Sequence, residues 1–243
     1  MPLVRIPTDS GAILYDPSRI DHPRPDDFDA PLLQAAGRIE GTAQGRGSVW
    51  FLSARGGSER WVLRHYRRGG LVAHVLRDSY LWRGATATRA FREIELLAVL
   101  EGLGLPAVRP VAARYVRSGL WYRADLLTVA VPGARTLAQL LGAGVARPLW
   151  LRIGATVRDF HEAGVGHADL NAHNVLIDAG ENVWLVDFDR GERRAPGAWR
   201  AANLARLQRS LEKLTTGAAG EFGAREWSAL LAGYEAPRSA PPR

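Results

Sequence analysis

The sequence contains no cysteine, one methionine and, among 32 basic residues, a single lysine, Lys213. Without cysteine the chain can form neither a disulfide framework nor a thiolate metal site, which suits a reducing compartment. It also lacks any apolar run of the roughly 18 residues that a transmembrane helix needs. The first seven residues contain no continuous apolar segment of the kind found in secretory signals. We therefore expect neither a membrane span nor a cleaved signal.

Positive charge is in excess. The formal net charge is +7, and arginine supplies nearly all of the cations. Such a surface attracts polyanions, which include nucleic acid, acidic lipid head groups and phosphorylated sugars. A nucleic-acid binder would also need an aromatic or basic recognition motif, and we find none, so we expect no nucleic-acid partner. A hydrophobic content of 47% and eight tryptophans indicate a folded core.

The chain divides into a β-rich first half and a helical second half. Residues 1–36 are rich in proline and aspartate and predict an irregular lead-in. Beyond them, the hydrophobic pattern predicts one helix at 88–103 and strands at 49–52, 61–66, 112–116 and 120–131. After Pro132-Gly133 it predicts two short strands at 175–177 and 183–187, and helices at 137–141, 147–163, 199–215 and 226–234.

Three polar residues of the second half stand at an informative spacing. Asp169 and Asn174 lie in the segment His167-Ala-Asp-Leu-Asn-Ala-His-Asn174, and Asp187 opens the segment Asp187-Phe-Asp189. A carboxylate that receives the proton of a hydroxyl group aligns it for attack on a phosphate, which is the catalytic role predicted for Asp169. Mg²⁺ accepts amide and carboxylate oxygens beside phosphate oxygens, so Asn174 and Asp187 are predicted to bind magnesium and, with it, ATP.

This spacing, with strands first and helices second, is that of kinase-fold enzymes. It predicts an α+β, protein-kinase-like fold of two lobes. The N-lobe, at 37–132, is expected to be small and mainly antiparallel β, with one key helix. The C-lobe, at 133–243, is expected to be mainly helical and to carry the catalytic and acceptor-binding groups. ATP is expected in the cleft between the lobes.

The first half supplies candidate phosphate-binding groups. Arg64 stands on a strand where most kinases place a lysine, and its guanidinium can bind phosphate through two N–H groups. Glu93, on the following helix, is the predicted partner of Arg64, with Glu95 as second choice. Because these two glutamates lie two residues apart, only one of them can face the cleft. Close approach of backbone amides to phosphate is predicted at Gly45, Gly47 and Ser48.

The roles of several neighbouring residues stay open. His167 is expected to support the backbone of the loop rather than to act in catalysis. His173 could reach substrate or cap the loop. Asp189 stands where kinases have a glycine, and is either an extra metal or substrate contact or a turn residue. The basic runs at 67–70 and 190–194 fit either an acidic substrate or an ordinary solvated surface.

The sequence resembles the lipopolysaccharide kinase family of Gram-negative bacteria, and within it the kinases of 3-deoxy-D-manno-octulosonic acid (Kdo). The resemblance covers about residues 35–215. It is carried by Leu63-Arg-His-Tyr-Arg-Arg-Gly-Gly70, Thr88-Arg-Ala-Phe-Arg-Glu93, the segment 167–174, and Val186-Asp-Phe-Asp-Arg-Gly191.

The resemblance implies an activity and a location. The activity is Mg²⁺-dependent transfer of phosphate from ATP to the 4-hydroxyl of Kdo on a lipid A precursor, an anionic glycolipid. The location is the cytoplasmic face of the inner membrane, with peripheral attachment. Only 191–199 separates the Asp187 motif from the next predicted helix, so an activation segment of the protein-kinase type is missing. That shortness argues against a large protein substrate.

Other functions stay open at this stage. A kinase of another lipopolysaccharide sugar, such as heptose, would share the same motifs. An aminoglycoside-type phosphotransferase usually has an acidic pocket, and the basic excess disfavours it. A catalytically silent, nucleotide-binding module would commonly lack one of Asp169, Asn174 and Asp187, and all three are present.

Overall fold

The computed structural model describes residues 2–44, 48–55, 57, 59–67, 78–216 and 222–237. The chain forms two compact units, each described by itself below. The first unit comprises Met1–Gly104 and Val108–Val131, and the second comprises Leu105–Ala107 and Pro132–Arg243. The predicted division between residues 132 and 133 falls next to this boundary. The short segment 105–107 was not predicted to belong to the second unit.

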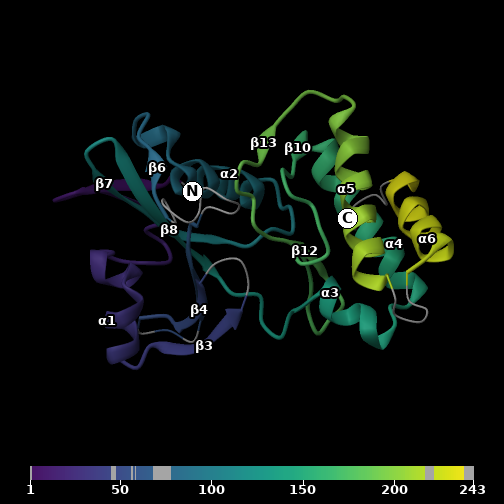
Figure 1. Cartoon of the computed structure of the whole chain (residues 1–243), viewed down its shortest axis with the longest axis horizontal. Helices are drawn as coiled ribbons and strands as arrows, with labels where there is room; N and C mark the ends of the chain where they lie inside the picture. Colours follow the sequence, from purple (N-terminus) through teal and green to yellow (C-terminus); the bar gives the residue numbers. More distant parts are fainter. Residues whose placement is uncertain are drawn as a thin grey trace. The chain divides into compact units, whose positions relative to one another are not determined.

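The first unit is built on one antiparallel sheet (Figure 1). Its strands run in the order β1-β2-β7-β8-β5-β4-β3, and β6 pairs with β8 outside this path. Their bounds are β1 (Val4–Thr8), β2 (Gly11–Tyr15), β3 (Ile39–Gln44), β4 (Ser48–Ser53), β5 (Arg60–His65), β6 (Tyr80–Leu81), β7 (Pro110–Ser118) and β8 (Trp121–Val129). The strands predicted at 49–52, 61–66, 112–116 and 120–131 are confirmed as β4, β5, β7 and β8.

Alternation along the strands gives this sheet two different faces. One face buries apolar residues such as Leu63 and Leu127 against Phe28 and Leu33, from the 3₁₀-helix η1 (Pro25–Phe28) and the helix α1 (Ala30–Ala35). The opposite face packs against α2 (Arg89–Gly102), the predicted helix. Because successive side chains of a strand point to opposite faces, Leu63 faces the α1 side and its neighbour Arg64 faces α2.

The prediction of an irregular lead-in at 1–36 is wrong. This segment contains the hairpin of β1 and β2, η1 and α1, and β2 pairs with β7. Asp27 is buried and forms ion pairs with Arg38 (3.0 Å) and Arg55 (2.7 Å). These partners lie further along the chain, so the acidic, proline-rich pattern of the segment gave no local sign of them.

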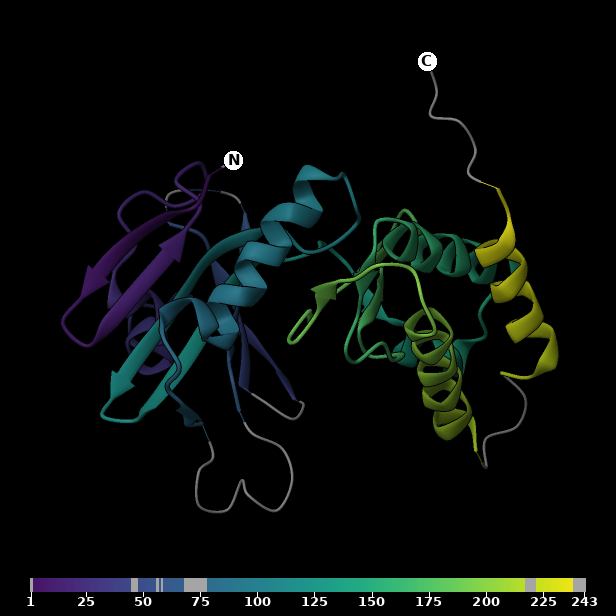
Figure 2. The ribbon, with the colours of Figure 1, turned by 90° about the horizontal axis from the view of Figure 1, so that it is seen from above.

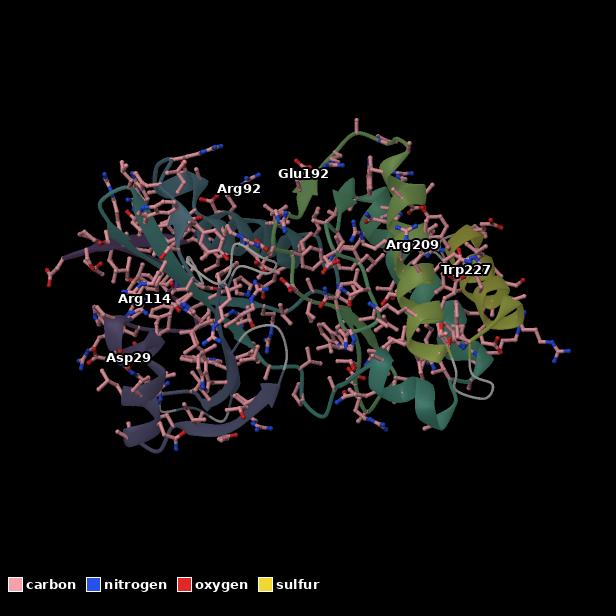
Figure 3. All side chains as sticks on the ribbon, in the orientation of Figure 1. Asp29, Arg92, Arg114, Glu192, Arg209 and Trp227 are labelled. Carbon is pink, nitrogen blue, oxygen red and sulfur yellow. The ribbon has the colours of Figure 1, made fainter. Side chains whose placement is uncertain are left out.

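Arg114 fastens the same segment to the sheet (Figure 3). Its guanidinium donates to the carbonyl oxygens of Pro25 (2.9 Å) and Phe28 (3.3 Å) and makes two hydrogen bonds to buried Asp125. Asp125 also contacts Nδ1 of His65 at 2.6 Å, and this contact is the main cause of the raised pKa of His65. The buried carboxylate is thus satisfied from two strands.

The second unit is mainly helical (Figure 2). Its two small sheets follow the orders β12-β11-β9 and β10-β13. Its elements are β9 (Arg135–Thr136), α3 (Leu137–Leu140), η4 (Leu141–Ala143), α4 (Arg147–Glu162), β10 (Val165–Gly166), β11 (Val175–Ile177), β12 (Val183–Leu185), β13 (Glu192–Arg193), α5 (Trp199–Thr215) and α6 (Ala224–Glu235). The four helices predicted after residue 133 are confirmed as α3, α4, α5 and α6. The strand predicted at 183–187 is β12, which ends two residues earlier.

Two glycines let α4 and α6 cross closely. A Cβ on Gly154 of α4 would lie 1.9 Å from the carbonyl oxygen of Leu230, and one on Gly233 of α6 would lie 1.9 Å from that of Leu151. The backbones therefore approach where a side chain is absent on each helix. None of the helices in the described residues is long and apolar enough to span a lipid bilayer.

Candidate active site

The segment 167–174 links β10 to β11 and contains Asp169 and Asn174, two of the three polar residues predicted from the sequence. Nδ2 of Asn174 donates to the carbonyl oxygen of Asp169 at 2.9 Å, which fixes the two residues relative to each other. The carbonyl oxygen of Asn174 accepts a hydrogen bond from the amide of Val186 at 3.0 Å. Because Val186 directly precedes Asp187, this bond ties both predicted magnesium ligands to one backbone frame.

His167 forms a second link within that frame. Its Nδ1 accepts a hydrogen bond from the amide of Asp169 (3.1 Å), and its Nε2 lies 2.9 Å from the carbonyl oxygen of Val186. An amide can only donate and a carbonyl can only accept, so the ring is neutral and carries its proton on Nε2. Burial lowers the pKa of His167, which favours that neutral form. These contacts fit the predicted scaffolding role.

Aromatic packing supports the segment 167–174 and the residues around Phe188. The ring of Phe188 is buried, with its centroid 4.7 Å from that of His167 and 5.5 Å from that of Phe160 in α4. Phe188 therefore anchors the chain between Asp187 and Asp189. The side chain of Asp189 is 16% exposed and lies 4.0 Å from Arg190.

Asp187 has an uncommon backbone conformation. Its φ is +62°, in the left-handed region that side chains other than glycine rarely adopt. Such a conformation costs about 1–3 kcal/mol and concentrates at functional sites, where the surrounding structure holds it in place. Here the bond between Val186 and Asn174 on one side and buried Phe188 on the other supply that restraint. The backbone of Asp187 is thus held in a defined conformation.

Helix α5 supports the segment through three residues that sequence analysis missed. Oδ1 of Asn203 accepts from the amide of His167 (3.1 Å), and Oγ of Ser210 accepts from the amide of Ala172 (3.2 Å). Between them, Arg206 donates to Oδ1 of Asp169 at 3.3 Å, and both side chains are about half exposed. Positions 203, 206 and 210 share one helix face, and this spacing is the signal that could have identified them.

His161, at the end of α4, connects three helices. Its Nδ1 lies 2.9 Å from the hydroxyl of Tyr234 in α6, and its Nε2 lies 3.4 Å from Oδ1 of Asn203 in α5. Burial lowers the pKa of His161 to about 4, so the ring is neutral at neutral pH. Asn203 therefore couples this helix junction to the backbone of the His167 segment.

The donor set fits a magnesium ion shared with phosphate. Asn174 uses its amide nitrogen toward Asp169, so Oδ1 is the atom that can accept a cation. Asn174 and Asp187 offer one amide oxygen and one carboxylate, and Mg²⁺ is usually held by one or two protein oxygens together with phosphate and water. Within the described ranges, no group of three or more His, Cys, Asp or Glu side chains is placed to hold a metal ion.

In the first unit, Arg64 and Glu93 form the predicted ion pair. Glu93 is buried, and its Oε2 also accepts from the hydroxyl of Tyr66 at 2.6 Å. Arg64 donates to the same hydroxyl at 3.1 Å, and its guanidinium lies 4.6 Å from the Tyr66 ring centroid. Glu95 is exposed on another face of α2, so the predicted choice between the two glutamates is resolved. The carboxylate and the tyrosine together fix the direction of the Arg64 guanidinium.

The predicted phosphate loop lies largely outside the described residues. Gly45 and Gly47 are not among them, and for Ser48 only the backbone, as the first residue of β4, is described. Residues 68–70 of the first basic run also lie outside the described residues. The close approach to phosphate predicted for Gly45, Gly47 and Ser48 stays a prediction, and the choice between an acidic substrate and a solvated surface stays open for the basic run.

Comparison with known proteins agrees with this geometry. The profile of the Lipopolysaccharide kinase (Kdo/WaaP) family matches residues 31–234, which is most of the chain. The chain belongs to this family. Lipopolysaccharide kinases of this kind are phosphotransferases with a hydroxyl acceptor, and the α+β, kinase-like architecture of the chain is the one expected of them. Use of a nucleotide as phosphate donor follows from membership.

Individual members of the family are similar over three quarters or more of their length. The 3-deoxy-D-manno-octulosonic acid kinase of Photobacterium profundum is 43% identical over 230 residues, which cover 94% of this chain and 97% of that protein. Proteins of the same name from Stenotrophomonas maltophilia and Xanthomonas campestris are each 48% identical. These matches cover 84% and 79% of this chain, and 81% and 76% of the two relatives.

Proposed function

We propose that this lipopolysaccharide kinase transfers the γ-phosphate of ATP to the 4-hydroxyl of Kdo on a lipid A precursor. The observation that carries the proposal is the hydrogen-bonded frame of His167, Asn174 and Val186, which fixes the backbone of Asp169 relative to Asn174 and to the residue that precedes Asp187. The relatives named as kinases of that sugar supply the acceptor. The reaction would take place at the cytoplasmic face of the inner membrane, to which the enzyme would be attached peripherally.

Each side chain would have a distinct part in this reaction. Asp169, half exposed and anchored through its backbone, would orient the acceptor hydroxyl and receive its proton. Asn174 and Asp187 would hold Mg²⁺, which neutralises charge on the phosphates when it is bound. Arg64, oriented by Glu93, would bind the phosphates of ATP.

The test is transfer of label from γ-labelled ATP with Mg²⁺, with a Kdo-bearing lipid A precursor and a heptose-bearing core offered side by side. We expect label on the Kdo acceptor only. Asp169→Ala should lower turnover on the order of a hundredfold or more, with little change in ATP binding. Asp21→Ala removes a carboxylate whose side chain is 88% exposed and serves as the matched control. Its turnover should equal that of the native enzyme.

Each alternative outcome has a definite meaning. Label on the heptose acceptor would keep the mechanism and change the acceptor. Near-normal turnover of Asp169→Ala would show that another group takes the proton. Bound ATP with label on neither acceptor would favour a silent, nucleotide-binding module.

A further inference from the structure

One end of the first unit's sheet carries a cluster of exposed apolar side chains. Leu120, in the turn between β7 and β8, is 71% exposed, while Leu81 and Trp121 are 46% and 37% exposed. We call these three residues the hairpin tip. Figures 1 and 2 both show the teal hairpin of β7 and β8 reaching the periphery of this unit. Large apolar side chains left this open are usually part of a binding surface when they are grouped.

The backbone holds the hairpin tip in shape. Leu81 of β6 stands opposite Trp121 of β8, and residues opposite each other in an antiparallel pair point to the same face. The amide of Trp82 donates to the carbonyl oxygen of Leu120 at 2.9 Å. Beneath the tip, Tyr80 and Tyr122 are buried, with ring centroids 5.5 Å apart. The hairpin tip is therefore held in a fixed shape before any partner binds. Its apolar side chains are exposed, while Tyr80 and Tyr122 on the other face of the same strands are buried.

Three exposed arginines accompany the hairpin tip: Arg83, Arg117 and Arg123. Arg117 stands opposite Tyr122 in the pair of β7 and β8, so it lies on the other face of the sheet from Trp121, with its guanidinium carbon 4.9 Å from the ring centroid of Trp82. Arg123 is two residues from Trp121 on β8 and so shares its face; it lies 3.9 Å from Asp78, which offsets part of the positive charge. The arginine side chains are permanently charged, so an apolar centre is bordered by fixed cations.

We propose that the hairpin tip inserts into the interfacial layer of an anionic lipid bilayer while these arginines contact lipid phosphates. Tryptophan favours the membrane interface, and leucine gains from leaving water. Arginines near an anionic membrane surface add electrostatic attraction. A stable protein interface buries about 800 Å² per partner over roughly 20–30 residues, whereas the hairpin tip consists of three apolar side chains.

The inference rests on the proposed function in one respect. A lipid-anchored acceptor lies in such a surface, so an enzyme docked there meets its acceptor without extracting it from the bilayer. The tip belongs to the first unit alone, and its binding to lipid requires no particular placement of the second unit.

The experiment is flotation of the full chain with two kinds of vesicle, phosphatidylcholine alone and an equal mixture of phosphatidylcholine and phosphatidylglycerol. We expect binding to the anionic vesicles and weak binding to the neutral ones. Leu120→Ser and Trp121→Ala should each lower the partition coefficient about tenfold. Arg123→Gln should lower it about fivefold at low salt and less at high salt. Equal binding of all these variants and the native chain would overturn the proposal.

Two further variants guard against a trivial explanation. Leu103→Ser changes a leucine that is 50% exposed elsewhere in the same unit and should leave vesicle binding unchanged. Loss of binding by this control as well would show that general surface hydrophobicity, not the hairpin tip, drives attachment. Trp121→Phe should keep binding but reduce quenching of tryptophan fluorescence by brominated lipid. Undiminished quenching would place Trp121 outside the bilayer and overturn the proposal.

Activity separates failure of this inference from failure of the proposed function. Leu120→Ser should keep native turnover on a deacylated, water-soluble Kdo acceptor and lose turnover on the acceptor in vesicles. Native turnover on both acceptors would refute the hairpin tip as the docking surface and leave the reaction intact. Specific vesicle binding without phosphate transfer to any Kdo acceptor would refute the proposed reaction and leave the surface intact.

Discussion

The crossing of α4 and α6 gives a prediction whose size follows from the geometry. In Gly154→Ala, the new Cβ would meet the carbonyl oxygen of Leu230 at 1.9 Å, whereas an ordinary contact begins near 3.4 Å. The difference, 3.4 Å less 1.9 Å, means that α6 must move by about 1.5 Å. The obstructing atom belongs to the backbone, so no side-chain rotation can relieve the clash. The hydrogen bond between His161 and Tyr234 lies on the same pair of helices and should weaken with this movement.

The net cost combines two opposite effects. Overpacking costs about 1–3 kcal/mol, occasionally more, and a backbone obstruction belongs at the upper end of that range. Replacing glycine by alanine inside a helix returns up to about 1 kcal/mol. We therefore expect Gly154→Ala to lower the free energy of unfolding by about 2 kcal/mol. For a chain of this length that corresponds to a fall in Tm of about 4–8 °C.

Differential scanning calorimetry is the appropriate assay, since it can resolve separate transitions of the two units. The control is Gly102→Ala in α2, where a Cβ would have nothing within 4 Å. This variant should melt at the native temperature or slightly above it. A Gly154→Ala protein that melts together with the control would refute the close crossing of α4 and α6.

The remaining predictions concern the site and its pH dependence. Glu93→Gln should raise the KM for ATP about tenfold or more, because Arg64 loses its buried counter-charge. Glu95→Gln, at an exposed position of the same helix, is the control and should have native kinetics. Equal kinetics of the two variants would contradict the pairing of Arg64 with Glu93. Asp187→Asn should abolish measurable turnover in a Mg²⁺ titration, and a native Mg²⁺ optimum would contradict its role as ligand. The pKa of His161 is about 4 in the folded protein and 6.5 in the unfolded chain, so below pH 6.5 the unfolded chain binds a proton at this residue that the folded protein does not. The contribution of His161 to the free energy of unfolding is therefore fully present above pH 6.5 and is lost as the pH falls toward 4. Urea unfolding should therefore show an acid loss of roughly 1–2 kcal/mol by about pH 5 that is absent in His161→Gln.

Local patterns predicted those parts of the structure whose causes are local. Helix geometry alone places Glu93 and Glu95 on different faces of α2. Glu93, the residue predicted to pair with Arg64, is the buried one. The apolar spacing of α4 likewise needs only its own sequence. The spacing of Asp169, Asn174 and Asp187 reflects one supersecondary unit, the segment 167–174 with two short strands, so the three residues were recognised together.

Features that depend on distant partners were not predicted. The buried pairing of Asp27 with Arg38 and Arg55 turns an acidic, proline-rich stretch into ordered structure, and nothing in the stretch itself reveals those partners. Asn203 and Arg206 point at the His167 segment because of how α5 packs in the second unit, which a helical pattern alone does not specify.

The pairing of β2 with β7 has a consequence for how the chain is made. Val116 pairs with Gly11, and the residues between them must leave the ribosome before this part of the sheet can close. Until then Ile13 and Leu14, both buried in the finished protein, have no strand on that side to cover them. Closing so long a loop is slow compared with forming a local hairpin. Until Val116 has been made, the hairpin of β1 and β2 lacks its partner strand β7, and this is the interval in which the unfinished sheet is prone to aggregate.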